Sequence, residues 1–300
     1  MKLITIPILL VLLGQGTLRP DPPKECDDCA RWNAPREPFR IFGNSYFVGV
    51  ADLSSVLIVS DNGMILVDGG LPQSAPLIDA NIRKLGFKTE NVRLIVNSHA
   101  HFDHAGGIAA LQRASGGTVA MSAAGARALE QGLPTPDDPQ YGLGAKFMSF
   151  PPVKNVKIVA DGEVIKVGDL AITAHLTPGH TPGGTTWSWR SCEGQRCVNF
   201  VYADSLTPVS APDFRYTGSA NPGLVDTFRR TIAKVAALPC DIVVSAHPGF
   251  MNMDGKLNER ATKPAADPFV DPDGCRTYAA EATKRLDARV AEEKKASAGR

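Results

Sequence analysis

The sequence predicts an α+β fold in which two β-sheets pack face to face, with helices on their outer faces. Strand-like runs and then helix-like runs follow one another in the first half of the chain, and the same order returns in the second half. Such an order fits two similar halves built around paired sheets. With 300 residues, 43% hydrophobic and 21% charged, residues 20–300 can bury a substantial core as a single domain.

The first half supplies strands and then helices. The turn signal Asp61–Gly63 separates two strand-like runs, which favours a β-hairpin. Apolar residues recur at helical spacing over 75–85 and stop at Gly86. The elements predicted in this half are strands at 39–42, 46–50, 55–60, 64–68, 94–96 and 118–121, and helices at 75–85, 104–114 and 123–131.

A second set of strands is predicted to start near Val156. Before it, residues 132–152 form a loop rich in Pro, Gly and Asp, and loops of this length in compact domains are often functional. The elements predicted in the second half are strands at 156–159, 163–167, 170–175, 185–189, 199–202 and 241–245, and helices at 224–237 and from 277 to about 296.

The amino terminus is typical of an exported protein. Lys2 is followed by an apolar run over 3–14, which is too short to span a bilayer comfortably. This pattern predicts a signal peptide over 1–19 with an unclear cleavage site, and a periplasmic or secreted protein. A membrane anchor or a buried strand is the alternative. The net charge of +1 gives no reason to expect nucleic acid or an anionic membrane as a partner.

Six cysteines support export, because disulfides persist in oxidising compartments. Cys192 and Cys197 flank a turn between two strand-like runs and could staple a hairpin. Pairing Cys240 with Cys275 would join a late strand to the C-terminal segment, which leaves the Cys-x-x-Cys pair at 26 and 29. That motif could be redox-active, but a thioredoxin-like context is missing. Six cysteines allow fifteen pairings, so this connectivity is a proposal by elimination.

Three histidines and an aspartate fall within six residues, directly after an apolar strand. His99 and His101 are two residues apart, so both imidazoles point to one side of an extended segment. Asp103 and His104 follow where a helix can begin, with Asp103 as its expected N-cap. Imidazole nitrogen and carboxylate oxygen suit zinc. The stretch therefore predicts a metal site, which we interpret as that of a two-metal hydrolase.

Two further histidines lie beside turn residues at the ends of predicted strands. His180 belongs to a turn rich in Pro and Gly, and His247 follows the strand at 241–245. Any one of these would more often be a hydrogen-bonded structural histidine. Five strand-end histidines together with Asp103 are hard to explain as packing, because such positions present functional side chains. His175, inside a predicted strand, is assigned a structural role.

These motifs resemble those of the metallo-β-lactamase superfamily, and the similarity covers about 40–260. It rests on His99-x-His-x-Asp-His104, Thr177-Pro-Gly-His180 and Ala246-His-Pro248. The resemblance implies the αβ/βα sandwich of that superfamily. Two details point to subclass B3 of the metallo-β-lactamases. Other subclasses have a metal-binding Cys where this chain has Ser205, and His104 is available as the ligand that subclass B3 requires.

The resemblance also implies two zinc ions per chain. It assigns one to His99, His101 and His180, and the other to Asp103, His104 and His247. The first site keeps the full +2 charge and the second keeps +1, so the pair would acidify a bridging water and attract an anionic substrate. The implied reaction is attack of the bridging hydroxide, oriented by the catalytic Asp103, on the ring amide of β-lactam antibiotics (penicillins, cephalosporins and carbapenems). Such an enzyme confers antibiotic resistance.

The resemblance further implies that Ser205 and Thr207 bind the substrate carboxylate, directly or through water. For Thr207, a purely structural role at the end of a strand is the alternative. The 132–152 loop would wall the pocket, with Gln140 and Tyr141 as substrate contacts. The expected partner is a small-molecule β-lactam, and the expected oligomeric state is a monomer.

Two alternatives stay open from the sequence. One is another hydrolase of the same fold, a lactonase or a glyoxalase-type thioesterase. In those families an aspartate in a Gly-Asp-x-Leu-like position bridges both metals, and Asp204 occupies a comparable place. Ala203 instead of Gly, and Ala-His-Pro rather than Gly-His-Gly around His247, argue against it. The other alternative is a non-catalytic zinc-binding scaffold, which would need the same ligands without an open cleft.

Overall fold

The computed structural model describes residues 18–263 and 267–298 of the chain. The predicted signal peptide at 1–19 therefore lies outside the described residues, except for its last two positions. Within the described ranges, no helix is both long enough and apolar enough to cross a membrane. Twelve strands in these ranges form two β-sheets, as the predicted fold class requires.

The first sheet has seven strands in the order β1-β2-β3-β4-β5-β6-β7. The pairs from β1 to β4 are antiparallel, whereas the pairs from β4 to β7 are parallel. The strands are β1 (Phe39–Phe42), β2 (Ser45–Phe47), β3 (Val56–Ser60), β4 (Gly63–Val67), β5 (Val92–Val96), β6 (Thr118–Ser122) and β7 (Val156–Val159).

The second sheet has five strands in the order β12-β11-β10-β9-β8. The pair formed by β11 and β12 is parallel, and the other pairs are antiparallel. The strands are β8 (Val164–Val167), β9 (Leu170–Leu176), β10 (Thr185–Glu193), β11 (Arg196–Ala203) and β12 (Ile242–Ser245).

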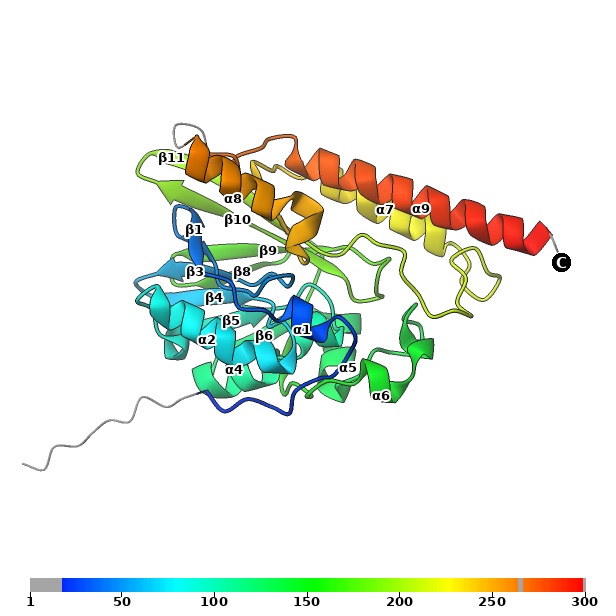
Figure 1. Cartoon of the computed structure of the whole chain (residues 1–300), viewed down its shortest axis with the longest axis horizontal. Helices are drawn as coiled ribbons and strands as arrows, with labels where there is room; N and C mark the ends of the chain where they lie inside the picture. Colours follow the sequence, from blue (N-terminus) through cyan, green and yellow to red (C-terminus); the bar gives the residue numbers. More distant parts are fainter. Residues whose placement is uncertain (1–17, 264–266, 299–300) are drawn as a thin grey trace, which may run out of the picture.

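Helices cover both outer faces, so the layers run helix, sheet, sheet, helix (Figure 1). Helices α2, α4 and α5 pack on the first sheet, and α7 and α9 pack on the second. The α-helices are α1 (Cys29–Trp32), α2 (Ala75–Lys84), α3 (Phe102–Ala105), α4 (Ile108–Ser115), α5 (Ala123–Gln131), α6 (Ala145–Met148), α7 (Leu224–Ala237), α8 (Met253–Thr262) and α9 (Gly274–Ala298). Short 3₁₀ turns are η1 (Pro72–Ser74), η2 (Thr89–Asn91), η3 (Tyr141–Leu143) and η4 (Pro248–Met251).

The main core lies between the two sheets. Trp187 and Phe200 of the second sheet pack in one cluster with Phe47 and Ile65 of the first, and all four side chains are fully buried. Burying a large apolar side chain contributes about 1.5–3 kcal/mol. The Trp187 indole also donates a hydrogen bond to the Asn97 carbonyl at 3.0 Å, which satisfies its polar N–H in the core. These contacts hold the two sheets together next to the metal-binding motif.

The prediction that Val156 starts a second set of strands is wrong. β7 pairs in parallel with β6, with Val119 opposite Val156, and therefore forms the edge of the first sheet. Helix α5 connects the two strands, because parallel neighbours need a crossover rather than a hairpin. The second sheet begins only with β8.

The single helix predicted over 104–114 is divided into α3 and α4. The break occurs where the neighbouring chain replaces helical hydrogen bonds: Gly107 N donates to Gly70 O at 3.1 Å, and His104 O accepts from Gly69 N at 2.8 Å. This close approach requires glycine, because a Cβ at Gly107 would lie 2.2 Å from Gly69 O. His101, not Asp103, is the N-cap of α3, so the N-cap prediction is wrong. Asp103 lies one position inside α3, which directs its carboxylate to the metal cluster rather than to the helix N-terminus.

All three predicted disulfides are confirmed: Cys26–Cys29, Cys192–Cys197 and Cys240–Cys275. The second staples the β10–β11 hairpin, where the two cysteines face each other in register. The third joins the segment before β12 to the first turn of α9. The first closes the loop from which α1 begins, a helix that the sequence did not predict.

Strand ends from both sheets meet at one edge of the sandwich. Val67 of β4 lies opposite Val96 of β5, so the two strands end side by side. Ala203 of β11 and Ser245 of β12 do the same in the second sheet. Residues that follow the carboxyl ends of neighbouring parallel strands share one edge, which is where open sheets place their sites. The predicted metal ligands lie at this edge.

Candidate metal centre

Three buried histidines form the first cluster. His99 and His101 follow β5, and His180 lies in the turn between β9 and β10. One donor atom from each lies within 4.8 Å of the others. The three side chains are at most 5% exposed. Three imidazoles at this spacing could hold one zinc ion and would leave its fourth coordination position for water or substrate, as in catalytic zinc sites.

Asp103, His104 and His247 form a second cluster beside the first. Asp103 Oδ2 lies 3.1 Å from His104 Nε2 and 3.4 Å from His247 Nε2. The two Nε2 atoms are 3.2 Å apart. His99 also lies within 4.8 Å of the donors of Asp103 and His104. The structure therefore brings all six predicted donors into one continuous group, drawn from both halves of the chain.

Backbone carbonyls orient two of the histidines. His180 Nδ1 lies 2.8 Å from the Thr207 carbonyl, and His247 Nδ1 lies 3.0 Å from the Asp52 carbonyl. A carbonyl only accepts, so Nδ1 carries the proton in both rings and, in the neutral ring, Nε2 carries the lone pair. The nitrogens that face the cluster are thus set up as metal ligands.

Buried carboxylates orient two more histidines. His99 Nδ1 lies 2.8 Å from Asp204 Oδ1, and His101 Nε2 lies 3.1 Å from Asp138 Oδ2. Both aspartates are at most 4% exposed. Such a contact on the outer nitrogen of a histidine fixes its ring, and the charged Asp138 carboxylate, whose pKa is, despite burial, lowered by His101, also makes the other nitrogen of His101 a better donor. His101 therefore offers Nδ1 to the cluster, while His99 offers Nε2.

Asp68 supports His104 from behind. Its backbone φ is +59°, an uncommon value for a residue other than glycine, and its side chain is fully buried at the end of β4. It accepts hydrogen bonds from Asn97, from Ser98 and from the Tyr202 hydroxyl. Its Oδ2 lies 3.8 Å from His104 Nδ1. Burial raises the pKa of Asp68, although His104 and these hydrogen bonds oppose the shift.

Burial and mutual repulsion disfavour the charged forms of His99 and His180. Burial is the main reason why the pKa of His99 lies well below its usual value and that of His180 falls to about 3, and neighbouring histidines add to both shifts. Burial would raise the pKa of Asp103, but His104 and His247 hold it well below its usual value. Burial likewise opposes the charged form of His104, yet Asp103 and Asp68 raise its pKa.

The second cluster fits a cation. His247 Nε2 carries a lone pair, and it faces His104 Nε2 and the ionised Asp103 carboxylate at hydrogen-bond distance. Three acceptors at this separation repel one another unless positive charge lies among them. In the metal-free protein, Asp103 and Asp68 raise the pKa of His104 against the effect of burial, so positive charge is favoured at this place. Imidazole and carboxylate donors suit zinc in the same place.

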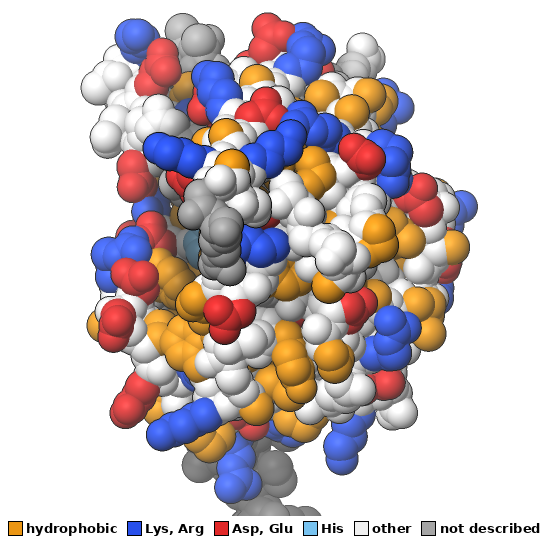
Figure 2. Space-filling view, turned by 90° about the vertical axis from the view of Figure 1, so that its right-hand side faces the viewer, with side chains coloured by type: hydrophobic (Ala, Val, Ile, Leu, Met, Phe, Trp, Pro, Cys, Tyr) orange, Lys and Arg blue, Asp and Glu red, His pale blue; other side chains and the backbone are white. Residues whose placement is uncertain are grey.

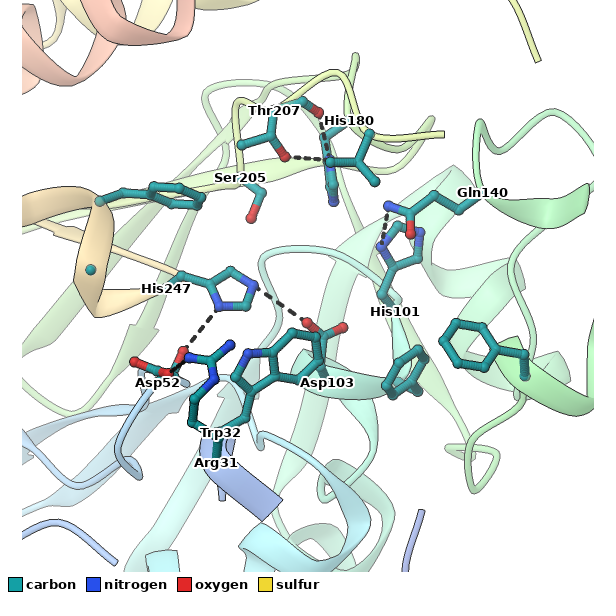
Figure 3. Close-up of a pocket in the computed structure, with 15 residues that line it drawn as sticks. Arg31, Trp32, Asp52, His101, Asp103, Gln140, His180, Ser205, Thr207 and His247 are labelled. Atoms are coloured by element: carbon teal, nitrogen blue, oxygen red, sulfur yellow. Dashed lines mark hydrogen bonds and ion pairs between the residues drawn. The ribbon is translucent and has the colours of Figure 1, made fainter. Parts of the chain in front are cut away.

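The cluster opens into a cavity of about 580 Å³. His101, Asp103, His180 and His247 reach its wall, and in Figure 3 their side chains point toward a common space. An open position beside metal donors distinguishes a catalytic site from a closed structural one. The cavity therefore argues against the non-catalytic scaffold.

The predicted substrate contacts occupy different places. Ser205, Thr207 and Gln140 line the cavity. Ser205 Oγ is buried and has no hydrogen-bond partner among the described residues, and in Figure 3 it points into the space between His247 and His180. Thr207 Oγ1 lies 3.2 Å from His180 Nδ1. Tyr141 is 39% exposed on η3 and is not among the cavity-lining residues.

Apolar side chains form the outer rim of the cavity. Phe147, Val209 and Phe250 line it although they are 41%, 50% and 41% exposed. In the space-filling view a histidine is visible in a recess, with hydrophobic side chains below it (Figure 2). Charges of both signs are mixed over the rest of this face. The rim can bind apolar substituents, while the cluster at its base provides the polar chemistry.

Several residues of the site were missed in the sequence. Trp32, Arg31 and Asp52 line one side of the cavity, and Trp32 packs edge-on against His247 with ring centroids 5.7 Å apart. Only the nearby Cys-x-x-Cys drew attention to this segment. Asp138 lies in the long loop whose length did predict a function, but no spacing singled it out. Asp68 could have been noticed as a carboxylate at the end of an apolar strand.

Two residues left open by the sequence can now be placed. Asp204 contacts the outer nitrogen of His99, and it belongs to neither group of potential metal donors found in the described residues. It therefore lies behind His99 rather than among these donor groups. His175 hydrogen-bonds to Ser188 at 2.7 Å and does not line the cavity, in keeping with its structural assignment.

Comparisons with known proteins agree with this geometry. The family described as "Metallo-beta-lactamase superfamily" matches residues 48–188. The solved structure of Rm3 metallo-beta-lactamase is 49% identical with a TM-score of 0.86, covering 90% of this chain and 99% of that one. MEM-A1, a subclass B3 metallo-beta-lactamase from a soil metagenome library, is 50% identical with a TM-score of 0.84, covering 88% of this chain and 98% of that one.

Similarity to curated sequences is more distant and more partial. Hydroxyacylglutathione hydrolase of Anaeromyxobacter dehalogenans is 28% identical over 66% of this chain and 61% of its own length. Acyl-coenzyme A thioesterase MBLAC2 of Gallus gallus is 32% identical over 30% of this chain and 35% of its own length. The chain thus spans only part of these relatives but nearly all of the two solved structures. It belongs to the metallo-β-lactamase superfamily, and its solved relatives at about half identity include a subclass B3 metallo-beta-lactamase.

Proposed function

We propose that this protein hydrolyses the ring amide of β-lactam antibiotics, using two zinc ions held in the cavity. The observation that carries the proposal is the group of six donors at the base of an open cavity, with the unpartnered hydroxyl of Ser205 beside it. Support also comes from the two metallo-beta-lactamases that match this chain over nearly their whole length.

Each ion would have its own donors. His99, His101 and His180 hold the first, and Asp103, His104 and His247 hold the second. Bound zinc lowers the pKa of water to near neutrality and polarises a carbonyl oxygen. Outer partners hold the rings of His99, His101, His180 and His247 in the orientation that metal binding requires, so these four need little reorganisation.

Asp103 is proposed to accept a hydrogen bond from the attacking water and to orient it. Its Oδ2 faces His104 and His247, so Oδ1 is the atom available to orient water toward the substrate carbonyl. The pKa of Asp103 lies well below its usual value, so the carboxylate is ionised at neutral pH and can accept a hydrogen bond. No side-chain nucleophile is required by this arrangement.

The hydroxyls of Ser205 and Thr207 are proposed to bind the carboxylate next to the β-lactam nitrogen. Ser205 Oγ has its hydrogen-bonding capacity free among the described residues, and Thr207 lies beside His180 at the same wall. Gln140 lines the cavity beside His101, where its Nε2 lies 3.5 Å from His101 Nδ1. Tyr141 stays a predicted contact, which would need the η3 segment to close over the substrate.

The decisive experiment is a hydrolysis panel with zinc-loaded protein. Penicillins, cephalosporins and carbapenems should all be opened, and EDTA should abolish the activity until zinc is restored. Metal analysis or native mass spectrometry of the same sample should give two zinc ions per chain. Intact β-lactams after incubation with fully loaded protein would contradict the proposal.

A thioesterase or lactonase activity is the second candidate, favoured by the partial match to hydroxyacylglutathione hydrolase. The position of Asp204 behind His99 weighs against it, because the bridging carboxylate expected for that chemistry is not there. A lactone and a glutathione thioester in the same panel separate the two activities.

We also propose that the chain is exported and acts as a monomer. Three disulfides and the absence of free cysteines fit an oxidising compartment. N-terminal sequencing of the mature protein tests removal of residues 1–19. Light scattering on the purified protein tests the oligomeric state.

A further inference from the structure

Helix α9 runs behind the loop that follows β11 and binds it through a buried carboxylate. Glu293 is only 4% exposed. It accepts hydrogen bonds from the N–H of Tyr216 at 3.0 Å, from the N–H of Thr217 at 2.8 Å and from Thr217 Oγ1 at 2.9 Å. A buried charge persists only when it is paired and hydrogen-bonded. These bonds therefore fix the far part of the loop on α9.

Arg289, one turn earlier on α9, binds the same loop at further points. Its Nε donates to Glu293 Oε1 at 2.6 Å. Its terminal nitrogens donate to Pro208 O at 3.2 Å, to Ser210 Oγ at 2.7 Å and to Phe214 O at 3.1 Å. The planar guanidinium fixes the direction of all four bonds together, which a lysine cannot reproduce.

Tyr278, near the start of α9, holds the first part of the loop. Its hydroxyl donates to the Asp204 carbonyl at 2.8 Å and accepts from the Leu206 N–H at 3.3 Å. These two residues flank Ser205 on either side. The backbone that carries Ser205 is thus held from behind by a side chain that is itself 3% exposed.

The front of this loop is the wall of the cavity. Ser205 and Thr207 line it, and in Figure 3 both lie on the side of the cavity that carries His180. Thr207 also accepts the hydrogen bond of His180 through its carbonyl. The same short stretch of chain therefore faces the substrate with two hydroxyls and faces α9 with its backbone.

We infer that Tyr278, Arg289 and Glu293 are positioning residues for recognition of the substrate carboxylate. They act by holding the loop over 204–217 so that the Ser205 and Thr207 hydroxyls are already in place when substrate arrives. The inference rests on the proposed function. Ordering a loop during binding costs about 1–2 kcal/mol for each residue that becomes fixed, so a pre-ordered loop favours tight binding of the anion.

The double variant Arg289→Met/Glu293→Leu tests this role. Removing both charges together leaves neither one buried without a partner, so the fold has the best chance of surviving. Tyr278→Phe removes only the hydroxyl and provides a second, milder variant. Asp287→Asn is the matched control, because it breaks an exposed pair between α9 and Arg229 of α7 without touching the loop.

The substrates are a cephalosporin with a free carboxylate and its methyl ester. Wild type should bind the free acid better. In the double variant, KM for the acid should rise about tenfold, which is the effect of losing one charge-assisted hydrogen bond. KM for the ester should stay unchanged, and kcat should change less than KM. Tyr278→Phe should shift the acid KM in the same direction by about threefold, and Asp287→Asn should not shift it.

Hydrogen exchange on the zinc-loaded proteins gives a readout that is independent of turnover. The amides of Tyr216 and Thr217 should exchange faster in the double variant, and that of Leu206 should exchange faster in Tyr278→Phe, with zinc content unchanged in both. An acid-to-ester KM ratio equal to that of wild type in both variants would overturn the inference. Wild type that opens no β-lactam would instead contradict the proposed function, and the recognition role with it.

Discussion

Asp138 contacts both His101, a proposed metal ligand, and Gln140, which lies in the loop that lines the cavity. Its carboxylate contacts His101 Nε2 at 3.1 Å and also accepts the N–H of Gln140 at 2.8 Å. Burial opposes its charged form, but His101 and the Gln140 bond lower its pKa, so the carboxylate is ionised at neutral pH. One residue thereby couples the orientation of His101 to the position of Gln140.

Asp138→Asn should weaken metal binding. The amide cannot stabilise the N–H of His101 as a carboxylate does, and loss of such an outer partner costs about 10- to 100-fold in metal affinity. Competition with a chromophoric chelator measures the change directly. Asp137→Asn is the control, because that neighbouring side chain is exposed. Equal zinc affinities for the two variants would show that Asp138 has no such role.

The six proposed metal donors could be selected from the sequence because residue type and local spacing both pointed to them, and the structure brings them together. Their outer partners could not, since these meet only in the folded chain. Asp204 is 105 residues from His99, and Asp138 is 37 residues from His101. An isolated aspartate in a loop carries no pattern that distinguishes a buried partner from a solvated one.

His180 should make the metal-free protein sensitive to acid. Its pKa falls to about 3 in the fold, mainly through burial, whereas an unfolded histidine titrates near 6.5. Between these values the unfolded chain binds more protons, so stability falls as the pH falls from about 6.5 to about 3. The slope from one such group is at most about 1.4 kcal/mol per pH unit. His99, whose pKa is also lowered, acts in the same direction.

Urea unfolding of chelator-treated protein at several pH values measures this slope. The His180→Asn variant should lose less stability than wild type on going from pH 7 to pH 5, with the remainder coming from His99 and other groups. Parallel stability curves for the two proteins would contradict the assignment of His180 as a buried neutral histidine.

At the scale of elements, helix α1 supports the second metal cluster. The end of α1 and the residues after it form backbone hydrogen bonds with the segment before β3. Asp52 N donates to Trp32 O at 3.1 Å, and Ala51 N donates to Ala34 O at 2.9 Å. The carbonyl of Asp52 in turn holds His247. The Cys26–Cys29 disulfide closes the loop at the start of α1. The Cys-x-x-Cys motif thus closes the loop that leads into α1, whose end is hydrogen-bonded to the segment holding His247, a proposed metal ligand.

Replacing both Cys26 and Cys29 with Ser should therefore loosen the second site more than the first. At limiting zinc, native mass spectrometry should show a larger share of protein with a single ion than in wild type. The control is the double Ser variant of Cys192 and Cys197, whose disulfide lies at the opposite end of β10 from the site. The same distribution of zinc in both variants would mean that α1 does not support His247.

Secondary structure was predicted correctly where hydrophobic periodicity was strong. It was predicted wrongly where contacts with distant segments of the chain determine the end of a helix or the sheet to which a strand belongs. Helix α5 and helix α7 have the predicted bounds. The break between α3 and α4 depends on the approach of Gly69 and Pro72 to Gly106 and Gly107, which local propensity does not contain. Assignment of β7 to the first sheet depends on its pairing with β6, which alternation in one strand cannot reveal.

At the scale of the whole molecule, the metal cluster connects the two halves of the chain. His99, His101, Asp103 and His104 come from the first sheet's side, whereas His180 and His247 come from the second. Bound zinc would link the sheets at the edge where four strands end. Since unfolding separates these donors, metal binding and stability must be coupled.

Removal of zinc should consequently lower the melting temperature. A ligand at 100 times its Kd adds about 2.7 kcal/mol of stability per site. For a domain of this size, 1 kcal/mol corresponds to roughly 2–4 °C, so EDTA should lower the transition by about 5–10 °C from the loss of one site alone. Differential scanning calorimetry with and without EDTA measures the shift, and added zinc should restore it. His175→Asn, remote from the cluster, should leave the EDTA shift unchanged, whereas His247→Asn should reduce it. An EDTA shift that His247→Asn does not reduce would show that His247 is not a metal ligand.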